Sequence, residues 1–313
     1  MRIIDKLPFI SPPQDRYTLF SSISIPSVRK KNQQVFSFAI DSPFYRGLGF
    51  DKSYKPFIKP FEKIFPEDTP IDELFQHFEE ELKKYVNNNL LNPKVKIGTY
   101  IPTKYGLLKT YSFPRTLKKS EFLQSIELYI EQDISEHFSN TEVIYTYSIL
   151  EGNKDEPYRV LVVIVERDFV LKIENLLHKF NLKADLISYE PICVVNLGLL
   201  KRLPQPFSIL YTDINKILLV SFYKNHISYE SFSFLFTGEK PNEDLLNLIL
   251  WDIRNYIVLN NLNNIYLAGI VTEYEDITSI FLERLPIFGI ITIDKFPNRF
   301  ALTYTLGERL LNG

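Results

Sequence analysis

The sequence predicts an α/β protein with two lobes, each built around a mixed β-sheet packed between helices. In each half, β-rich segments joined by tight turns precede segments that alternate between helix and strand. Residues 158–166 (YRVLVVIVE) are almost uniformly aliphatic, as is typical of a strand covered on both faces. The 313 residues, 45% of them hydrophobic, can bury a substantial core. We therefore expect two α/β halves that enclose a cleft.

Three regions follow from this pattern. Residues 1–34 are polar, contain several prolines and end in VRKKNQQ, so we expect an N-terminal arm rather than core. Residues 35–200 form the first lobe and residues 201–313 the second.

The first half alternates strands and helices in a regular order. A hairpin of residues 35–41 and 44–51 is followed by a helix over 71–90, with Leu74, Phe78 and Leu82 on one face. Thr69, Pro70 and Asp72 resemble an N-cap, a proline at the first helical position and the acid of a capping box. The remaining elements expected in this half are strands at 94–102, 105–114, 140–150, 158–166 and 184–190, and helices at 119–138, 170–180 and 192–200.

The second half is expected to have a similar order of strands and helices, with different segment lengths. The expected strands are 207–213, 216–225, 226–236, 263–269 and 288–296, and the expected helices are 242–261, 275–285 and 298–311. Trp251 lies on the long helix near Leu245, Leu248 and Ile249, so we expect it to pack in the core.

Composition excludes several functional classes. The formal charge of −2 argues against a broad nucleic-acid surface. The single cysteine, Cys193, rules out an internal disulfide, and with four histidines and no HExxH spacing we expect no metal site. The longest apolar runs fall short of the ~18 residues of a membrane span, and the first residues lack a signal peptide. We therefore expect a cytoplasmic protein without a nucleic-acid partner.

Five segments, in their order and spacing, resemble a known family. These are residues 108–138, 160–191, the hairpin YTDINKILLVS at 211–221, IYLAGI at 265–270 and the closing helix at 300–310. Together they are similar to the PilM family, the cytoplasmic actin-like proteins of type IV pilus assembly, which is related to FtsA and the actin-like ATPase superfamily.

The resemblance, which covers residues 35–312, has implications for both fold and partners. It implies an actin-like (ribonuclease H-like) two-lobed fold with a small inserted subdomain, expected at about 52–118. It also implies that a groove beside this subdomain binds the N-terminal tail of a bitopic inner-membrane protein similar to PilN. Membrane association would then come only through that partner. The motor ATPase or the platform protein of such a machine is a further expected partner.

The family's nucleotide site is incomplete in this sequence. Asp41 and Asp213 are retained, but Ser42 and Asn215 stand where the two phosphate-binding turns have glycine, whose lack of Cβ lets phosphate approach the backbone. In an alternative register, Pro43 takes the first glycine position and removes an N–H donor. The remaining differences concern Lys216, which could pair with a phosphate, and Gly269, which is followed by Ile270 instead of a second glycine.

We interpret these positions as remnants and expect no catalytic residues and no bound ATP or Mg²⁺. The alternative is a purely structural role, in which Asp41 and Asp213 are turn residues that hydrogen-bond to their own backbone.

The N-terminal arm offers a separate hypothesis. Its first residues resemble the Ile-Asn-Leu-Leu-Pro tail by which PilN engages its groove, so Ile3, Leu7 and Pro8 could dock in the chain's own groove or in a neighbour's. A disordered terminus is the alternative.

The histidines and the cysteine carry no catalytic signal. His77 and His137 lie in charged helical stretches, His226 follows a turn, and Cys193 lies in an apolar helix as a small buried hydrophobe.

The sequence thus predicts a non-enzymatic cytoplasmic scaffold of a pilus, secretion or DNA-uptake machine. Two alternatives stay open. One is an ATP-binding protein whose nucleotide state regulates partner binding. The other is an FtsA-like filament former, which is disfavoured because neither end shows an amphipathic membrane-targeting helix.

Overall fold

The computed structural model describes residues 33–150, 157–224, 226–236 and 242–312. The arm residues Ile3, Leu7 and Pro8 lie outside this range, so their docking stays a hypothesis.

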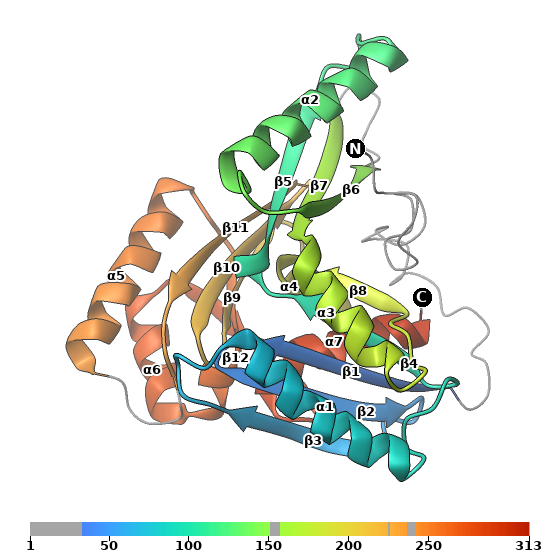
Figure 1. Cartoon of the computed structure of the whole chain (residues 1–313). Helices are drawn as coiled ribbons and strands as arrows, with labels where there is room; N and C mark the ends of the chain where they lie inside the picture. The colour runs from blue at the N-terminus through green and yellow to red at the C-terminus, as the bar shows by residue number, and fades with distance from the viewer. Residues whose placement is uncertain (1–32, 151–156, 225, 237–241, 313) are drawn as a thin grey trace.

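The first lobe is built on a five-stranded mixed sheet, in the lower part of Figure 1. Its first three strands are antiparallel neighbours, and the next two continue the sheet in parallel. The order is β3-β2-β1-β4-β8, with β1 at Gln34–Asp41, β2 at Phe44–Asp51, β3 at Pro56–Ile64, β4 at Lys96–Ile101 and β8 at Leu186–Tyr189.

The second lobe repeats this topology. Three antiparallel strands again lead into two parallel ones, which confirms the repeated pattern expected from the sequence. The order is β11-β10-β9-β12-β13, with β9 at Phe207–Thr212, β10 at Lys216–Tyr223, β11 at His226–Ser233, β12 at Ile265–Gly269 and β13 at Ile287–Ile290.

A separate three-stranded antiparallel sheet forms the inserted subdomain, at the top of Figure 1. Its order is β5-β7-β6, with β5 at Gly106–Phe113, β6 at Val143–Leu150 and β7 at Tyr158–Glu166. Helix α2 (Lys119–His137) covers one face and closes a small core of its own. The expected bounds of 52–118 are therefore wrong, because β3 and β4 pair within the first lobe's sheet and the insertion spans 106–166.

The other helices cover the two large sheets. Helices α1 (Ile71–Asn87) and α3 (Arg167–His178) pack together beside the first sheet, and α5 (Glu243–Leu259) and α6 (Glu275–Arg284) pack beside each other on the second lobe. Helix α4 (Glu190–Leu200) contacts strands of both sheets. Short 3₁₀ turns occupy Thr103–Tyr105, Ile270–Glu273 and Asn298–Phe300.

The last helix corrects the expected lobe boundary. Helix α7 (Ala301–Asn312) packs on β1, β2 and β4, so residues 301–312 belong structurally to the first lobe although they close the chain. The largest core cluster joins both lobes, because it contains Phe38 and Leu306 as well as Phe207 and Val220. The lobes therefore share buried surface around α4 and α7.

The outer edge of the first sheet is protected from further strand pairing. Strand β3 carries Pro56, Lys59, Pro60 and Lys63, and prolines and lysines hinder an additional strand from pairing.

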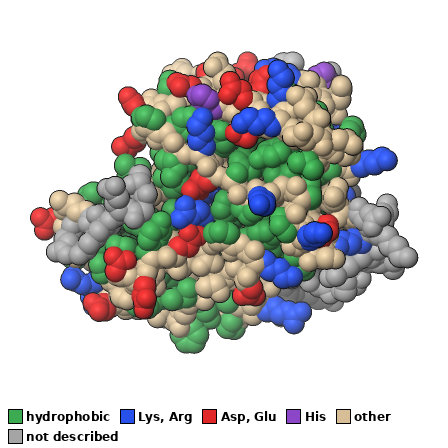
Figure 2. Space-filling model, turned by 90° about the horizontal axis from the view of Figure 1, so that it is seen from below, with side chains coloured by type: hydrophobic (Ala, Val, Ile, Leu, Met, Phe, Trp, Pro, Cys, Tyr) green, Lys and Arg blue, Asp and Glu red, His purple; other side chains and the backbone are tan. Residues whose placement is uncertain are grey.

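Figure 2 shows the molecule from below, where hydrophobic side chains gather near the centre and charges of both signs surround them.

Candidate functional site

The two hairpin turns expected to hold phosphates contact each other directly. The first turn joins β1 to β2, and the second joins β9 to β10. The Asn215 amide donates hydrogen bonds to Asp41 Oδ2 at 3.0 Å and to the carbonyl of Ser42 at 2.7 Å. The asparagine that replaces glycine in the second turn thus fastens that turn to the first.

Lys216 lies between two buried carboxylates where the two lobes meet. Its Nζ is 2.8 Å from Asp41 Oδ2 and 2.6 Å from Glu190 Oε2. Thr103 closes the group, because its backbone N–H donates to Glu190 Oε2 at 2.9 Å and its Oγ1 lies 3.4 Å from Nζ. Asp41 and Glu190 are fully buried and Lys216 nearly so. The ammonium group therefore has partners within the protein.

A second buried cation neutralises the other retained aspartate. Arg46, in β2, lies 2.6 Å from Asp213 Oδ1 and 2.9 Å from Glu62 Oε2. Arg299, which follows β13, binds the same Glu62 at 2.9 Å and Glu273 at 2.7 Å. Arg46 and Asp213 are both buried. A guanidinium from the first lobe thus pairs with an aspartate of the second, while Lys216 of the second pairs with Asp41 of the first.

Burial and ion pairing shift the pKa values of these groups in opposite directions. Burial raises the pKa of Asp213 above its ordinary value, opposed by Arg46, and it also raises the pKa of Glu190, opposed by Lys216. Burial alone would lower the pKa of Lys216, but Asp41 and Glu190 raise it above its ordinary value. The lysine is therefore charged at neutral pH.

Three acceptor oxygens in this group have no hydrogen-bond partner among the described residues. They are Asp41 Oδ1, Glu190 Oε1 and Asn215 Oδ1, and all three atoms are buried. Lys104 is the nearest further cation, with Nζ 3.8 Å from Asp41 Oδ1. Such oxygens require donors, which ordered water supplies. A phosphate, which is itself an acceptor, would add to this requirement.

Gly269 has a structural reason to be glycine. Its φ of +93° lies in the region that favours glycine, and a Cβ there would lie 2.1 Å from the carbonyl oxygen of Thr212. The next residue, Ile270, is buried. The third nucleotide motif therefore has its glycine at a position where the backbone of β12 lies too close to that of β9 for a side chain.

Two grooves border the small sheet. A narrow slot of about 10 Å³, room for a single water molecule, separates β6 and β7 from the ends of β4 and β8. Its walls are mostly aliphatic, with Thr146, Ser188 and Tyr189 as the polar members. Thr146 Oγ1 is buried without a hydrogen-bond partner in the described part of the chain. A wider groove of about 680 Å³ lies between the edge strands β5 and β11.

Thr110 bridges the walls of the wider groove. Its hydroxyl lies 3.3 Å from both the backbone N–H and the carbonyl of Ile227. Lys104 and Lys109 also line this groove, and Glu230 faces it from β11.

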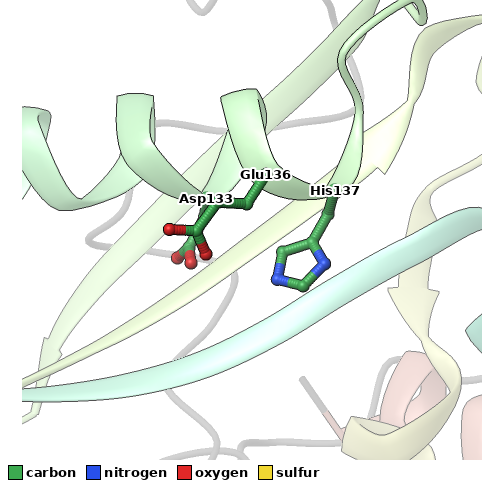
Figure 3. Close-up of side chains that lie close together, drawn as sticks. All are labelled: Asp133, Glu136 and His137. Atoms are coloured by element: carbon green, nitrogen blue, oxygen red, sulfur yellow. The ribbon is translucent and has the colours of Figure 1, made fainter.

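One group of potential metal ligands lies on the last turn of α2. Asp133, Glu136 and His137 place a ligand atom each within 4.8 Å of one another (Figure 3). Lys109 already forms an ion pair with Asp133, and Gln132 donates to Glu136 at 2.8 Å. The cluster has partners of its own, so we assign no metal to it.

The expectations for Cys193 and the helical histidines are confirmed, whereas the expectation for Trp251 is not. Cys193 is buried as expected, and burial raises the pKa of its thiol to about 12. His137 is exposed as expected, and His77 lies near Glu73 and Glu80 on a partly exposed surface. The expectation for Trp251 is wrong, because its side chain faces solvent and Ile249, Leu250 and Ile253 form the buried side of α5.

Sequence reasoning missed Arg46 and Glu190. Arg46 interrupts an otherwise apolar strand, FYRGLGFD, and a single charge within a buried strand is a signal that a partner must exist. Glu190 precedes a proline at the start of an apolar helix, and nothing local separates it from an ordinary first-turn acid.

Comparison with solved structures identifies the fold. A structure described as the PilM–PilN type IV pilus biogenesis complex has a TM-score of 0.68 and 11% identity, and the match covers 89% of this chain and 99% of that chain. A Bacteroides thetaiotaomicron protein with an actin-like ATPase fold has a TM-score of 0.54 and 13% identity, covering 90% and 96%. The cytoplasmic domain of EpsL, an inner-membrane component of the Vibrio cholerae type II secretion system, has a TM-score of 0.50 and 10% identity, covering 90% and 96%.

These likenesses show that the chain has the actin-like ATPase fold, as the resemblance implied. No protein-family model and no curated protein sequence matches the chain. Among the residues that the structure describes, helices long and apolar enough to cross a membrane are absent.

Proposed function

We propose that this chain is a non-enzymatic actin-like scaffold that binds the N-terminal tail of a bitopic inner-membrane protein in a pilus, secretion or DNA-uptake machine. It would reside in the cytoplasm and reach the membrane through that partner. A motor ATPase or platform protein would be a second partner of the same machine.

The observation that carries the non-enzymatic part is the position of Lys216. An actin-like site needs its two aspartate turns free to receive phosphate and metal, whereas here Lys216 and Arg46 neutralise Asp41 and Asp213. Opening the site would leave buried charges unpaired, which typically costs about 3–5 kcal/mol for each broken pair. ATP binding would have to supply that energy before gaining any affinity.

The tail-binding part is supported by the wider groove of about 680 Å³ beside the small sheet. Leu107, Ile227 and Tyr229 in its walls suit apolar side chains, and β5 and β11, as edge strands, offer backbone groups to an extended chain. A neighbour of this fold was solved as a PilM–PilN complex, and another is the cytoplasmic domain of an inner-membrane secretion component. These structural neighbours guide the choice of partner class.

A thermal-shift measurement tests the absence of nucleotide binding. Mg-ATP at a hundred times its dissociation constant would stabilise the protein by about 2.7 kcal/mol, an easily measured shift. We expect the same melting temperature with Mg-ATP, with Mg-ADP and in buffer. An ATP-specific rise that Asp213→Ala abolishes would instead establish an ATP-binding protein regulated by nucleotide.

A peptide titration tests tail binding separately. Fluorescence anisotropy of a labelled Ile-Asn-Leu-Leu-Pro peptide should show saturable binding to the wild-type protein. Thr110→Val keeps the side-chain volume and removes the hydroxyl that bridges the groove walls, so it should weaken binding about fivefold, the value of one hydrogen bond.

The matched control for this titration is Thr146→Val, which makes the same change in the narrow slot. Equal weakening by both variants, or by Thr146→Val alone, would contradict the assignment of the tail to the wider groove.

A further inference from the structure

The outer surface of helix α5 is unusually apolar. Leu245, Leu248, Trp251, Val258 and Leu259 are 50%, 58%, 62%, 66% and 80% exposed. They are five of the fourteen large hydrophobic side chains exposed among the described residues, and all five lie on one helix of 17 residues. Exposed apolar residues are normally scattered singly, so this concentration marks an interaction surface.

The opposite side of the same helix already fills the lobe's core. The residues that pack there are Leu246, Ile249, Leu250, Ile253 and Ile257. An ordinary surface helix is polar on its outer side. Helix α5, at the outer edge of the molecule in Figure 1, is apolar on both sides and therefore has one side whose partner is missing.

The exposed side chains are arranged nearly symmetrically about Trp251. Leu245 lies about two turns before it and Val258 about two turns after it, at 3.6 residues a turn. Trp251 would therefore sit at the crossing point of two antiparallel copies of α5. Each Leu245 would then meet Val258 and Leu259 of the other copy. In this arrangement the two helix dipoles are antiparallel, so the N-terminus of each helix lies beside the C-terminus of the other, which is favourable.

We propose that this surface binds a second copy of the chain through an antiparallel pairing of two α5 helices about a two-fold axis. The inference is independent of the proposed function. A standard interface buries roughly 800 Å² per partner, and the stripe of five large apolar side chains that are at least half exposed can supply its apolar centre. The same surface patch serves both subunits, as two-fold interfaces require.

The charges around the stripe favour a protein over a membrane as its partner. Helix α5 carries one basic residue, Arg254, and three acidic ones. Asp244, Asp252 and Arg254 are exposed along the stripe. Membrane-surface helices instead carry an excess of lysine and arginine to bind anionic lipids.

Trp251 supplies the test, because it is the only tryptophan in the chain. Sedimentation velocity and tryptophan emission are recorded on the full chain over a dilution series. We expect a monomer–dimer equilibrium in which the emission moves to shorter wavelength as the dimer forms. Leu248→Glu should shift this equilibrium to monomer by at least tenfold in dissociation constant, and Val258→Glu should do the same.

Leu128→Glu is the matched control, since Leu128 is 65% exposed on α2, a different helix. It should leave the dimer and the emission shift intact. A protein that stays monomeric at every concentration, with unchanged emission, overturns self-association through the stripe. A dimer that survives both Leu248→Glu and Val258→Glu overturns the assignment to α5.

Discussion

Gly269 illustrates how a residue of a nucleotide motif can be required for other reasons. It ends β12 with a φ of +93°, and its Cα passes so close to Thr212 that a Cβ would lie 2.1 Å from the carbonyl oxygen. The retained glycine is thus explained by the backbone alone. Its presence carries no information about a ligand.

We expect Gly269→Ala to be strongly destabilising. The positive φ alone costs about 1–3 kcal/mol, and the contact with Thr212 forces a further backbone shift. Urea unfolding measures the effect. Gly289→Ala in β13 is the control, because its Cβ would meet only Tyr266 at 3.4 Å. Equal stability losses for the two variants would contradict the backbone explanation.

Helix starts show where local sequence rules succeed and fail. Helix α5 begins as such rules describe, with the Asn242 side chain accepting hydrogen bonds from the N–H groups of Asp244 and Leu245. Helix α1 does not, because Pro70 takes the N-cap position and the side-chain cap expected from Thr69 is absent. Ser42 Oγ instead donates to the Thr69 carbonyl at 3.4 Å, which connects Thr69 to the turn between β1 and β2.

Alanine substitutions at the two positions should therefore differ. Asn242→Ala should cost about 1 kcal/mol of stability, the usual value of a lost N-cap, and Thr69→Ala should be nearly neutral. Chemical denaturation of both variants provides the comparison. A larger loss for Thr69→Ala would mean that its hydroxyl caps α1 in solution.

At the scale of the whole molecule, buried ion pairs connect the two lobes. Arg46 of the first lobe pairs with Asp213 of the second, and Lys216 of the second pairs with Asp41 of the first. The shared core around α4 and α7 adds apolar contacts to this connection. We infer that these contacts hold the lobes in one arrangement, which suits a scaffold.

Removing one member of the Arg46–Asp213 pair should be severe. Arg46→Met leaves Asp213 buried without its main partner, and such changes cost about 3–5 kcal/mol. Arg167→Met, which breaks a surface pair with Glu142, should cost less than about 1 kcal/mol. The double variant Arg46→Met/Asp213→Leu should regain stability, because it leaves no unpaired charge there. Similar losses for both arginine variants would contradict the role of the buried pair.

Much of the element order could be read from the sequence. The apolar periodicity of α1 and α2, the aliphatic run of β7 and the hairpin turns between β1 and β2 and between β9 and β10 are local patterns, so they predicted the elements and the repeated two-lobed topology. The resemblance to actin-like proteins also led to Asp41, Asp213, Asn215 and Lys216, which the structure brings together. These features depend on neighbours in the chain or on a known motif.

Other features depended on contacts between distant residues. The partners Arg46 and Asp213 are 167 positions apart, and nothing local to either one predicts the other. The bounds of the small subdomain depended on which strands β3 and β4 pair with, and strand pairing is a long-range choice.

The exposure of Trp251 was undetermined for a related reason. Helix α5 is apolar on two sides, and periodicity cannot show which of them the sheet will cover. The sequence by itself therefore determined the elements and their order, because local patterns carry that information. The tertiary structure alone decided which cations neutralise Asp41 and Asp213 and which face of α5 stays exposed, because burial is a property of the assembled molecule.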